Sequence, residues 1–187
     1  MPLNLNVIVA STRPGRAGIH VANWFHPLAQ AHGAFEARLV DLVEVGLPLY
    51  DEPNHPAQRK YVHDHTKRWS AIVASADAFV FVVPEYNFGP TPALLNALEY
   101  VYHEWHFKPA AFVSYGGLSG GLRGVQQIKP VLTTLNVMPI PNAVMIQWIG
   151  KRIRDGAFLP EEVHVDSVKP MLDALARWAA ALKPMRD

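Results

Sequence analysis

The sequence predicts a doubly wound α/β fold, in which helices cover both faces of a mainly parallel β-sheet. Two observations support this prediction. Short apolar runs, typical of strands buried on both faces, alternate along the chain with longer segments of helical periodicity. Polar or glycine-rich loops follow several of these runs, as they do where strands cross over to helices. The 187 residues show no repeat, low-complexity tract or linker, so we expect one domain, 1–187.

Five segments are predicted as strands. The clearest is Ala78–Val83, which is apolar throughout and is followed by Pro84. Near residue 37, Phe35, Ala37 and Leu39 alternate with charged residues, as in a strand with one exposed face. The predicted strands are Leu3–Ala10, Phe35–Leu42, Ala78–Val83, Ala110–Tyr115 and, within 137–149, Ala143–Gln147.

Five further segments carry apolar residues at the three- and four-residue spacing of helices. In the first, Pro27 is expected to kink or shorten the helix, and Gly33 to follow its end. In the third, Pro92 suits the first turn. Segments 46–56 and 155–160 are predicted loops. The predicted helices are Gly18–Ala31, Gln58–Ala74, Thr91–Trp105, Leu122–Leu135 and Glu161–Leu182.

Composition removes several classes of function. A formal net charge of +1 gives no electrostatic reason to expect nucleic acid or an anionic membrane as a partner. The absence of cysteine excludes disulfides, thiolate zinc sites, iron–sulfur clusters and a cysteine nucleophile. The start of the chain has no signal-peptide pattern, and no apolar run approaches the ~20 residues that span a bilayer. We therefore expect a cytoplasmic protein without a resident metal.

The loop after the first predicted strand has the chemistry of an anion site. Ligands of doubly wound folds bind beyond the carboxyl ends of the strands, where helix N-termini also lie. Ser11 and Thr12 offer hydroxyl groups, Arg13 and Arg16 offer positive charge, and Gly18 allows a close approach of the backbone. The loop matches neither the P-loop nor the dinucleotide fingerprint. An ordinary capped turn with solvated arginines is an equally good interpretation.

The loop after the third predicted strand, Pro84–Gly89, combines aromatic and amide groups. Tyr86 and Phe88 offer flat apolar surfaces, and Asn87 offers both donors and acceptors. Backbone amides near residues 85–87 are expected to face the rim of a planar heterocycle. The alternative is a turn whose aromatic side chains cover the end of the core.

The loop after the fourth predicted strand, Ser114–Gly124, contains five glycines. Glycine leaves the backbone N–H groups bare, so they can line the edge of a ligand. The alternative is a flexible connector, although five glycines are entropically costly for that purpose.

A serine hydrolase is an alternative reaction class for this loop. Residues 117–121 spell G-x-S-x-G around Ser119, and Asp155 and His164 follow in hydrolase order. Against this, a nucleophilic serine belongs at a sharp strand-to-helix turn, whereas Ser119 is separated from the predicted strand by several residues.

A metal site is a second alternative. Glu99, His103 and His106 are spaced to share one helix face and could ligate a metal. No acidic cluster completes the set, so a solvated or interface face is the preferred interpretation.

Taken together, the three loops resemble those of the NAD(P)H-dependent FMN reductase family. Ala10–Arg16 is similar to the family's G-S-T-R-P-G-R, with alanine at the first position. Pro84–Asn87 is its P-E-Y-N, and Leu94–Tyr100 matches the following L-x-N-A-L-[DE]-[YW]. Ser114–Gly121 matches its glycine-rich stretch. The resemblance covers residues 4–143, and the order of the motifs makes it specific.

The resemblance implies a role for each loop. The first would hold the FMN phosphate, the second would line the isoalloxazine ring, and the third would meet the pyrimidine edge of that ring. Tyr86 and Asn87 would lie nearest the reacting ring, and no catalytic acid or base is implied. The implied cofactor-binding residues are Ser11, Arg13, Arg16, Gly18 and Ile19 for the phosphate, Pro84, Glu85, Tyr86 and Asn87 for the ring, and Ser114, Tyr115, Gly116 and Gly117 for the edge.

The resemblance also implies a fold and a reaction. The fold would be flavodoxin-like, with strand order 2-1-3-4-5. Non-covalent FMN would accept hydride from NADPH or NADH and then reduce a small acceptor by a ping-pong scheme. Free flavin, a quinone, an azo or nitro compound and a metal oxyanion are all open as acceptors. A non-catalytic flavin carrier or redox sensor is the alternative, but such carriers are usually strongly acidic.

A homodimer or homotetramer is implied as well. Aromatic residues near the end of the third predicted helix would suit an apolar subunit interface. They are Tyr100, Tyr102, Trp105 and Phe107.

Overall fold

The predicted sheet is present, with the predicted strand order. The computed structural model describes residues 2–186. Its main sheet has the order β2-β1-β3-β4-β5, and every neighbouring pair is parallel. The register of the β4–β5 pairing shifts between Ala110 and Phe112. The strands are β1 (Leu3–Val9), β2 (Phe35–Asp41), β3 (Ala78–Pro84), β4 (Lys108–Tyr115) and β5 (Val137–Ile146).

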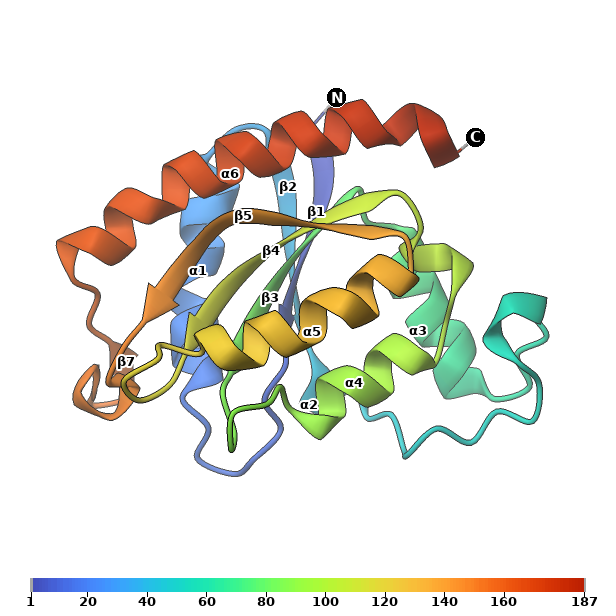
Figure 1. Cartoon of the computed structure of the whole chain (residues 1–187), viewed down its shortest axis with the longest axis horizontal. Coiled ribbons are helices and arrows are strands. Elements are labelled where there is room, and N and C mark those ends of the chain that lie inside the picture. The colour runs from blue at the N-terminus through green and yellow to red at the C-terminus, as the bar shows by residue number, and fades with distance from the viewer. Residues whose placement is uncertain (1, 187) are drawn as a thin grey trace.

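Helices cover both faces of the sheet, so the chain has two apolar cores (Figure 1). Val7 and Val9 of β1 face α1 and α6, whereas Ile8 faces the side of α3, α4 and α5. Successive strand residues point to opposite faces, which explains why the buried strands are apolar at every position. The helices are α1 (Gly18–Ala31), α2 (Leu42–Val45), α3 (Asp64–Ala74), α4 (Pro92–Glu99), α5 (Leu122–Thr134) and α6 (Glu162–Leu182), with single 3₁₀ turns at η1 (Pro56–Gln58), η2 (His103–Trp105), η3 (Ile149–Lys151) and η4 (Lys183–Arg186).

Several predicted boundaries are wrong. The first helix keeps its predicted bounds, Gly18–Ala31, and Pro27 does not shorten it, because its buried face is held by the core on both sides of the proline. The second predicted helix begins at Asp64 rather than Gln58. The third helix ends at Glu99, and a 3₁₀ turn then carries Trp105 into contact with two other core aromatics. The predicted loop 155–160 contains part of a two-stranded hairpin, β6 (Ile153–Arg154) and β7 (Ala157–Phe158).

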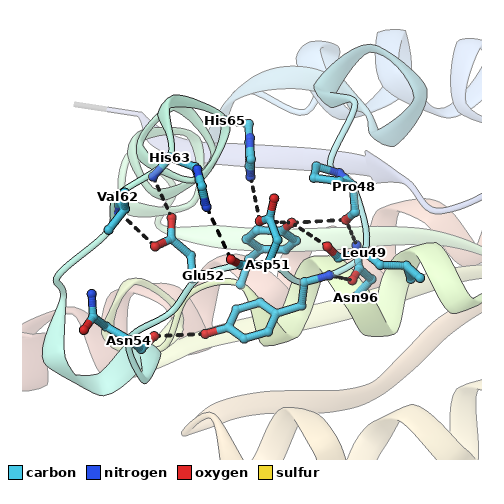
Figure 2. A network of polar contacts seen from close by, with 11 residues as sticks. Pro48, Leu49, Asp51, Glu52, Asn54, Val62, His63, His65 and Asn96 are labelled. Carbon is cyan, nitrogen blue, oxygen red and sulfur yellow. Dashed lines mark hydrogen bonds and ion pairs between the residues drawn. The ribbon is translucent and has the colours of Figure 1, made fainter.

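The segment between α2 and α3 is tied down by a polar network over α4 (Figure 2). The Tyr100 hydroxyl donates to Asp51 at 3.0 Å, and His65 contacts the same carboxylate at 3.0 Å. Glu52 accepts bonds from the Val62 and His63 amides at 2.8 and 2.9 Å. Burial pushes the pKa of the Glu52 carboxyl up, but these bonds outweigh it and keep the pKa below its ordinary value.

This packing corrects the expected interface. Tyr100 and Trp105 are completely buried inside the chain. They therefore cannot form an exposed apolar face, and only Tyr102 and Phe107 keep part of their surface accessible.

Candidate functional site

The three predicted loops lie together at the carboxyl edge of the sheet. Figure 1 shows the loops after β1, β3 and β4 on one side, at the lower left. The Arg13 guanidinium lies 5.9 Å from the centre of the Tyr86 ring, which joins the first loop to the second. The Glu85 amide donates to the Tyr115 carbonyl at 3.0 Å, which joins the second to the third. The fold therefore brings the three predicted loops together.

Two buried hydroxyl groups form a corner at the start of α1, which we call the hydroxyl corner. It consists of Ser11, Tyr115 and Gly18. Ser11 is fully buried and Tyr115 is 4% exposed. Neither side-chain oxygen makes a hydrogen bond of good geometry among residues 2–186, although the two hydroxyl groups lie close enough for Ser11 to oppose the increase in the pKa of Tyr115. A Cβ added to Gly18 would overlap both oxygens. Burial raises the pKa of the Tyr115 phenol, so this group is a neutral donor at neutral pH.

The N-terminus of α1 beside this corner is open. Ala17 stands at the N-cap and provides no side-chain hydrogen bond, and no acidic residue lies in the first turn. The first amides of a helix lack intrahelical partners and carry the positive end of the helix dipole. Gly18 and Ile19 begin this helix, so their amides are placed for an anion.

Asp41 contacts a predicted site residue, Arg16, and the sequence analysis missed it. Its carboxylate forms a buried ion pair with Arg16, and it also accepts a bond from the Val43 amide at 3.0 Å. Arg16 is therefore not a solvated arginine. The only sequence signal was a charged residue at the end of a strand, which is common at such ends and gave no pairing partner.

The second loop is a tight two-residue turn. Tyr86 and Gly89 exchange backbone bonds of 3.0 and 2.9 Å, and the residues between them, Asn87 and Phe88, have φ values of 50° and 70°. Asparagine tolerates this left-handed conformation, but phenylalanine does so poorly. Phe88 is 60% exposed and contacts Arg123, whose guanidinium lies 4.1 Å from the ring centre. Phe88 therefore does not cover the core, and the turn projects Asn87 and Phe88 into solvent.

Glu85 faces the third loop rather than an open space. It accepts a bond from the Ser119 hydroxyl at 2.7 Å and another from the Arg123 amide at 3.0 Å. Burial alone would raise the pKa of Glu85, but these bonds outweigh burial and keep the pKa below its ordinary value. The amides of Glu85 and Tyr86 already donate within the protein, so among the amides of residues 85–87 that of Asn87 is the candidate donor to a ligand.

Hydrogen bonds within the third loop and to residues 146–148 hold this loop in place. The Ser114 hydroxyl donates to the Gly120 carbonyl at 2.8 Å, and the Gly116 amide donates to the Ile146 carbonyl at 3.1 Å. The Gly117 carbonyl accepts a bond from the Trp148 amide at 3.0 Å. Ser114 and Gly116 therefore support the loop, and the Tyr115 side chain lies at the hydroxyl corner. Of the residues implied at the pyrimidine edge, Gly117 is the exposed one.

Comparison with known proteins decides the family. The sequence model described as NADPH-dependent FMN reductase matches residues 3–149. The chain belongs to this family. It is 42% identical over 156 residues to an NAD(P)H-dependent FMN reductase of Schizosaccharomyces pombe, covering 82% of this chain and 78% of that protein. A Saccharomyces cerevisiae protein of the same description is 45% identical over 142 residues, covering 72% and 74%.

A solved structure extends the comparison to the fold. The flavoenzyme NAD(P)H:(acceptor) oxidoreductase FerB from Paracoccus denitrificans superposes with a TM-score of 0.74, at 22% identity and over 96% of this chain and 98% of that one. The predicted flavodoxin-like fold is thus confirmed. Membership in the FMN reductase family also confirms the predicted oxidoreductase class, and FMN with a nicotinamide as the cofactors typical of it.

The geometry does not form a hydrolase triad in this FMN reductase. The Ser119 hydroxyl donates to Glu85. His164 is 4% exposed and accepts a bond from the Glu161 amide at 2.9 Å, as part of the cap of α6. Asp155 sits in the β6–β7 turn. These roles account for Ser119 and His164 without catalysis.

A metal centre is not assembled either. Residues 2–186 hold no group of three or more His, Asp or Glu side chains that could bind a metal ion. His103 contacts the Ala57 carbonyl at 2.9 Å, and its ring lies 5.1 Å from that of His106. Glu99 belongs to α4, whereas His103 begins a separate 3₁₀ turn, so the expected common helix face does not exist.

Proposed function

We propose that the protein binds FMN non-covalently across the three loops and uses NADPH or NADH to reduce a small oxidised acceptor. The hydroxyl corner carries the proposal. Ser11 and Tyr115 have buried hydroxyl groups without partners, and unpaired buried donors are destabilising. A phosphate group at the start of α1 would accept these hydroxyl bonds together with the helix amides, so the residues fit the cofactor.

The residues around the corner would supply charge and position. Arg13 and Arg16 would offset the charge of the phosphate dianion, and the amides of Gly18 and Ile19 would donate hydrogen bonds to its remaining oxygens. Gly18 is required here because a methyl group would occupy the space between the hydroxyls. All five residues that the family resemblance implies for phosphate binding, including Ser11, would then contact the same phosphate group.

The outer loops would place the flavin ring and admit the substrates. Bound FMN supplies the hydride chemistry. Tyr86 would flank the ring, and the amides of Asn87 and Gly117 would donate to its edge, where negative charge develops on reduction. The exposed side chains of Phe88 and Trp148 flank these loops and would favour flat apolar acceptors, such as quinones, azo compounds or free flavin.

The expected partners are small molecules. No helix within residues 2–186 has the length and apolar character needed to cross a membrane. A cytoplasmic location and a homodimer or homotetramer stay predictions. Tyr102 and Phe107 are only partly exposed and do not specify that interface.

A visible absorption spectrum tests the proposal. The purified protein, as isolated or after adding FMN and removing the excess, should show flavin bands near ~375 and ~450 nm that bleach with anaerobic NADPH or NADH. Re-oxidation by a quinone or azo dye would then identify the acceptor class. A protein that retains no flavin after saturation with FMN contradicts the proposal.

A further inference from the structure

Asp41 is a buried carboxylate with two partners at the edge of the hydroxyl corner. It ends β2 directly beside Val9 of β1, and its side chain is only 6% exposed. A buried carboxylate is strongly unfavourable unless it is paired and hydrogen-bonded. One oxygen accepts the Val43 amide and caps α2, and the other pairs with Arg16. Both carboxylate oxygens of Asp41 therefore have partners, one in α2 and one in the Arg16 side chain.

The Arg16 guanidinium is held by only one of its edges. Its terminal nitrogen pairs with Asp41, while its Nε atom is buried and has no partner among the described residues. A guanidinium presents five donors in a planar fork and can bind two anions at once. Arg16 also acts electrostatically on the Tyr115 phenol, where it opposes the increase in pKa due to burial, so its charge reaches the hydroxyl corner.

We propose that Asp41 is a positioning residue for the flavin phosphate, because it holds the Arg16 guanidinium beside the start of α1. This inference rests on the proposed binding of FMN. Arginine has a long, flexible side chain, and ordering it on binding weakens the affinity unless it is ordered beforehand. Asp41 orders Arg16 in the absence of the ligand. Binding of the FMN phosphate should depend on this arrangement, whereas binding of the flavin ring should not.

A purely electrostatic role for Asp41 predicts the opposite change in FMN affinity. Asp41 is itself an anion near a phosphate site, and its charge offsets that of Arg16. If that were its main effect on the cofactor, its neutralisation would strengthen FMN binding. The sign of one affinity change therefore separates positioning from simple charge compensation.

Asp41→Asn is the test variant, since asparagine is as good an N-cap as aspartate and should preserve α2. Affinities for FMN and for riboflavin, which lacks the phosphate, are measured by quenching of flavin fluorescence. We expect FMN to bind about three- to tenfold more weakly, and riboflavin to change by less than about twofold. Tighter FMN binding, unchanged FMN binding, or an equal loss for both flavins overturns the inference.

A double-mutant cycle shows whether Asp41 acts through Arg16. Arg16→Gln should weaken FMN binding and leave riboflavin binding unchanged. Adding Asp41→Asn to Arg16→Gln should produce no further loss, because the residue that Asp41 positions is gone. If the double variant instead loses FMN affinity by the sum of the two single-variant losses, the inference is overturned.

Two controls keep the outcomes distinct. Wild-type protein that binds neither flavin refutes the proposed function rather than the role of Asp41. If Asp41→Asn shows no cooperative thermal transition, Arg16→Lys becomes the deciding variant, since lysine keeps the charge but cannot bind Asp41 and a phosphate as a fork. Weaker FMN binding with unchanged riboflavin binding supports the inference, and unchanged FMN binding overturns it.

Discussion

The first and third loops of the site are built in opposite ways. In the first, Ser11 is buried without a partner, Ala17 leaves α1 uncapped, and Arg16 keeps a buried nitrogen unpaired among residues 2–186. In the third, Ser114 and Ser119 both donate hydrogen bonds within the protein. The hydroxyl groups of the third loop therefore find their partners within the protein, whereas we expect those of the first to be satisfied only when an anion binds. Glycine-rich composition alone would have suggested the reverse.

Gly121 gives the largest expected effect, because the third loop depends on its backbone shape. Its φ is +90°, and an added Cβ would lie 2.7 Å from the Tyr115 amide nitrogen. Backbone cannot move aside as a side chain can. We expect Gly121→Ala to lower the free energy of unfolding by about 3 kcal/mol or more, from conformational strain and overlap combined. Urea denaturation measures this without any flavin.

Gly117→Ala is the matched control in the same loop. Gly117 has no positive φ, and an added Cβ would meet no atom within 4 Å. The free energy of unfolding of Gly117→Ala should differ from that of the wild type by less than about 0.5 kcal/mol, as for an ordinary surface substitution. Equal losses for the two variants would mean that the loop is not rigid.

Gly18 gives the corresponding test of the first loop, with a smaller effect on stability. Overpacking against Ser11 and Tyr115 is unfavourable by about 1–3 kcal/mol, but alanine is about 1 kcal/mol better than glycine in a helix. We expect Gly18→Ala to remain folded and to bind FMN at least about tenfold more weakly, a change of about 1.4 kcal/mol. Flavin titration and thermal unfolding measure both quantities.

Gly150→Ala serves as the control for Gly18→Ala, because an added Cβ there meets nothing within 4 Å. It should leave FMN affinity and stability unchanged. Normal FMN binding by Gly18→Ala would contradict the assignment of the hydroxyl corner to the phosphate.

This contrast also explains what could be predicted from the sequence. Strand order and the meeting of three loops followed from apolar runs and family motifs, since both depend on local pattern. The direction of the Tyr115 side chain did not, because it depends on the space above Gly18. The pairing of Asp41 with Arg16 joins residues from different strand–helix connections, and no periodicity reports that. Trp105 was misplaced for the same reason, as its burial depends on aromatic partners from α3 and β3.

Glu85 makes the stability of the third loop dependent on pH. Its folded pKa lies below the ordinary value of 4.5, because bonds from Ser119 and Arg123 outweigh the effect of burial. Its contribution is therefore complete above about pH 4.5 and is lost as the pH falls through the lower, folded pKa. Glu85→Gln should destabilise the protein by about 1–3 kcal/mol at neutral pH.

Urea denaturation at several pH values checks this. The stability difference between wild type and Glu85→Gln should shrink steadily as the medium becomes more acidic than about pH 4.5. A difference that stays constant down to the acid transition would show that the Glu85 carboxylate does not carry the effect.

Phe88 gives the smallest effect and the opposite sign. Its φ of +70° is unfavourable for phenylalanine, and asparagine adopts this conformation with less strain. Phe88→Asn relieves about 1 kcal/mol of strain or more, but loses a cation–π contact with Arg123 of about 0.5–1 kcal/mol. We expect a gain of up to about 2–4 °C in the melting temperature.

Arg123→Gln, which removes the contact alone, should instead be neutral or slightly destabilising. If Phe88→Asn gains stability and also raises the KM for an aromatic acceptor, the strain is retained for substrate binding. If it gains stability with KM unchanged, Phe88 is not part of the acceptor site.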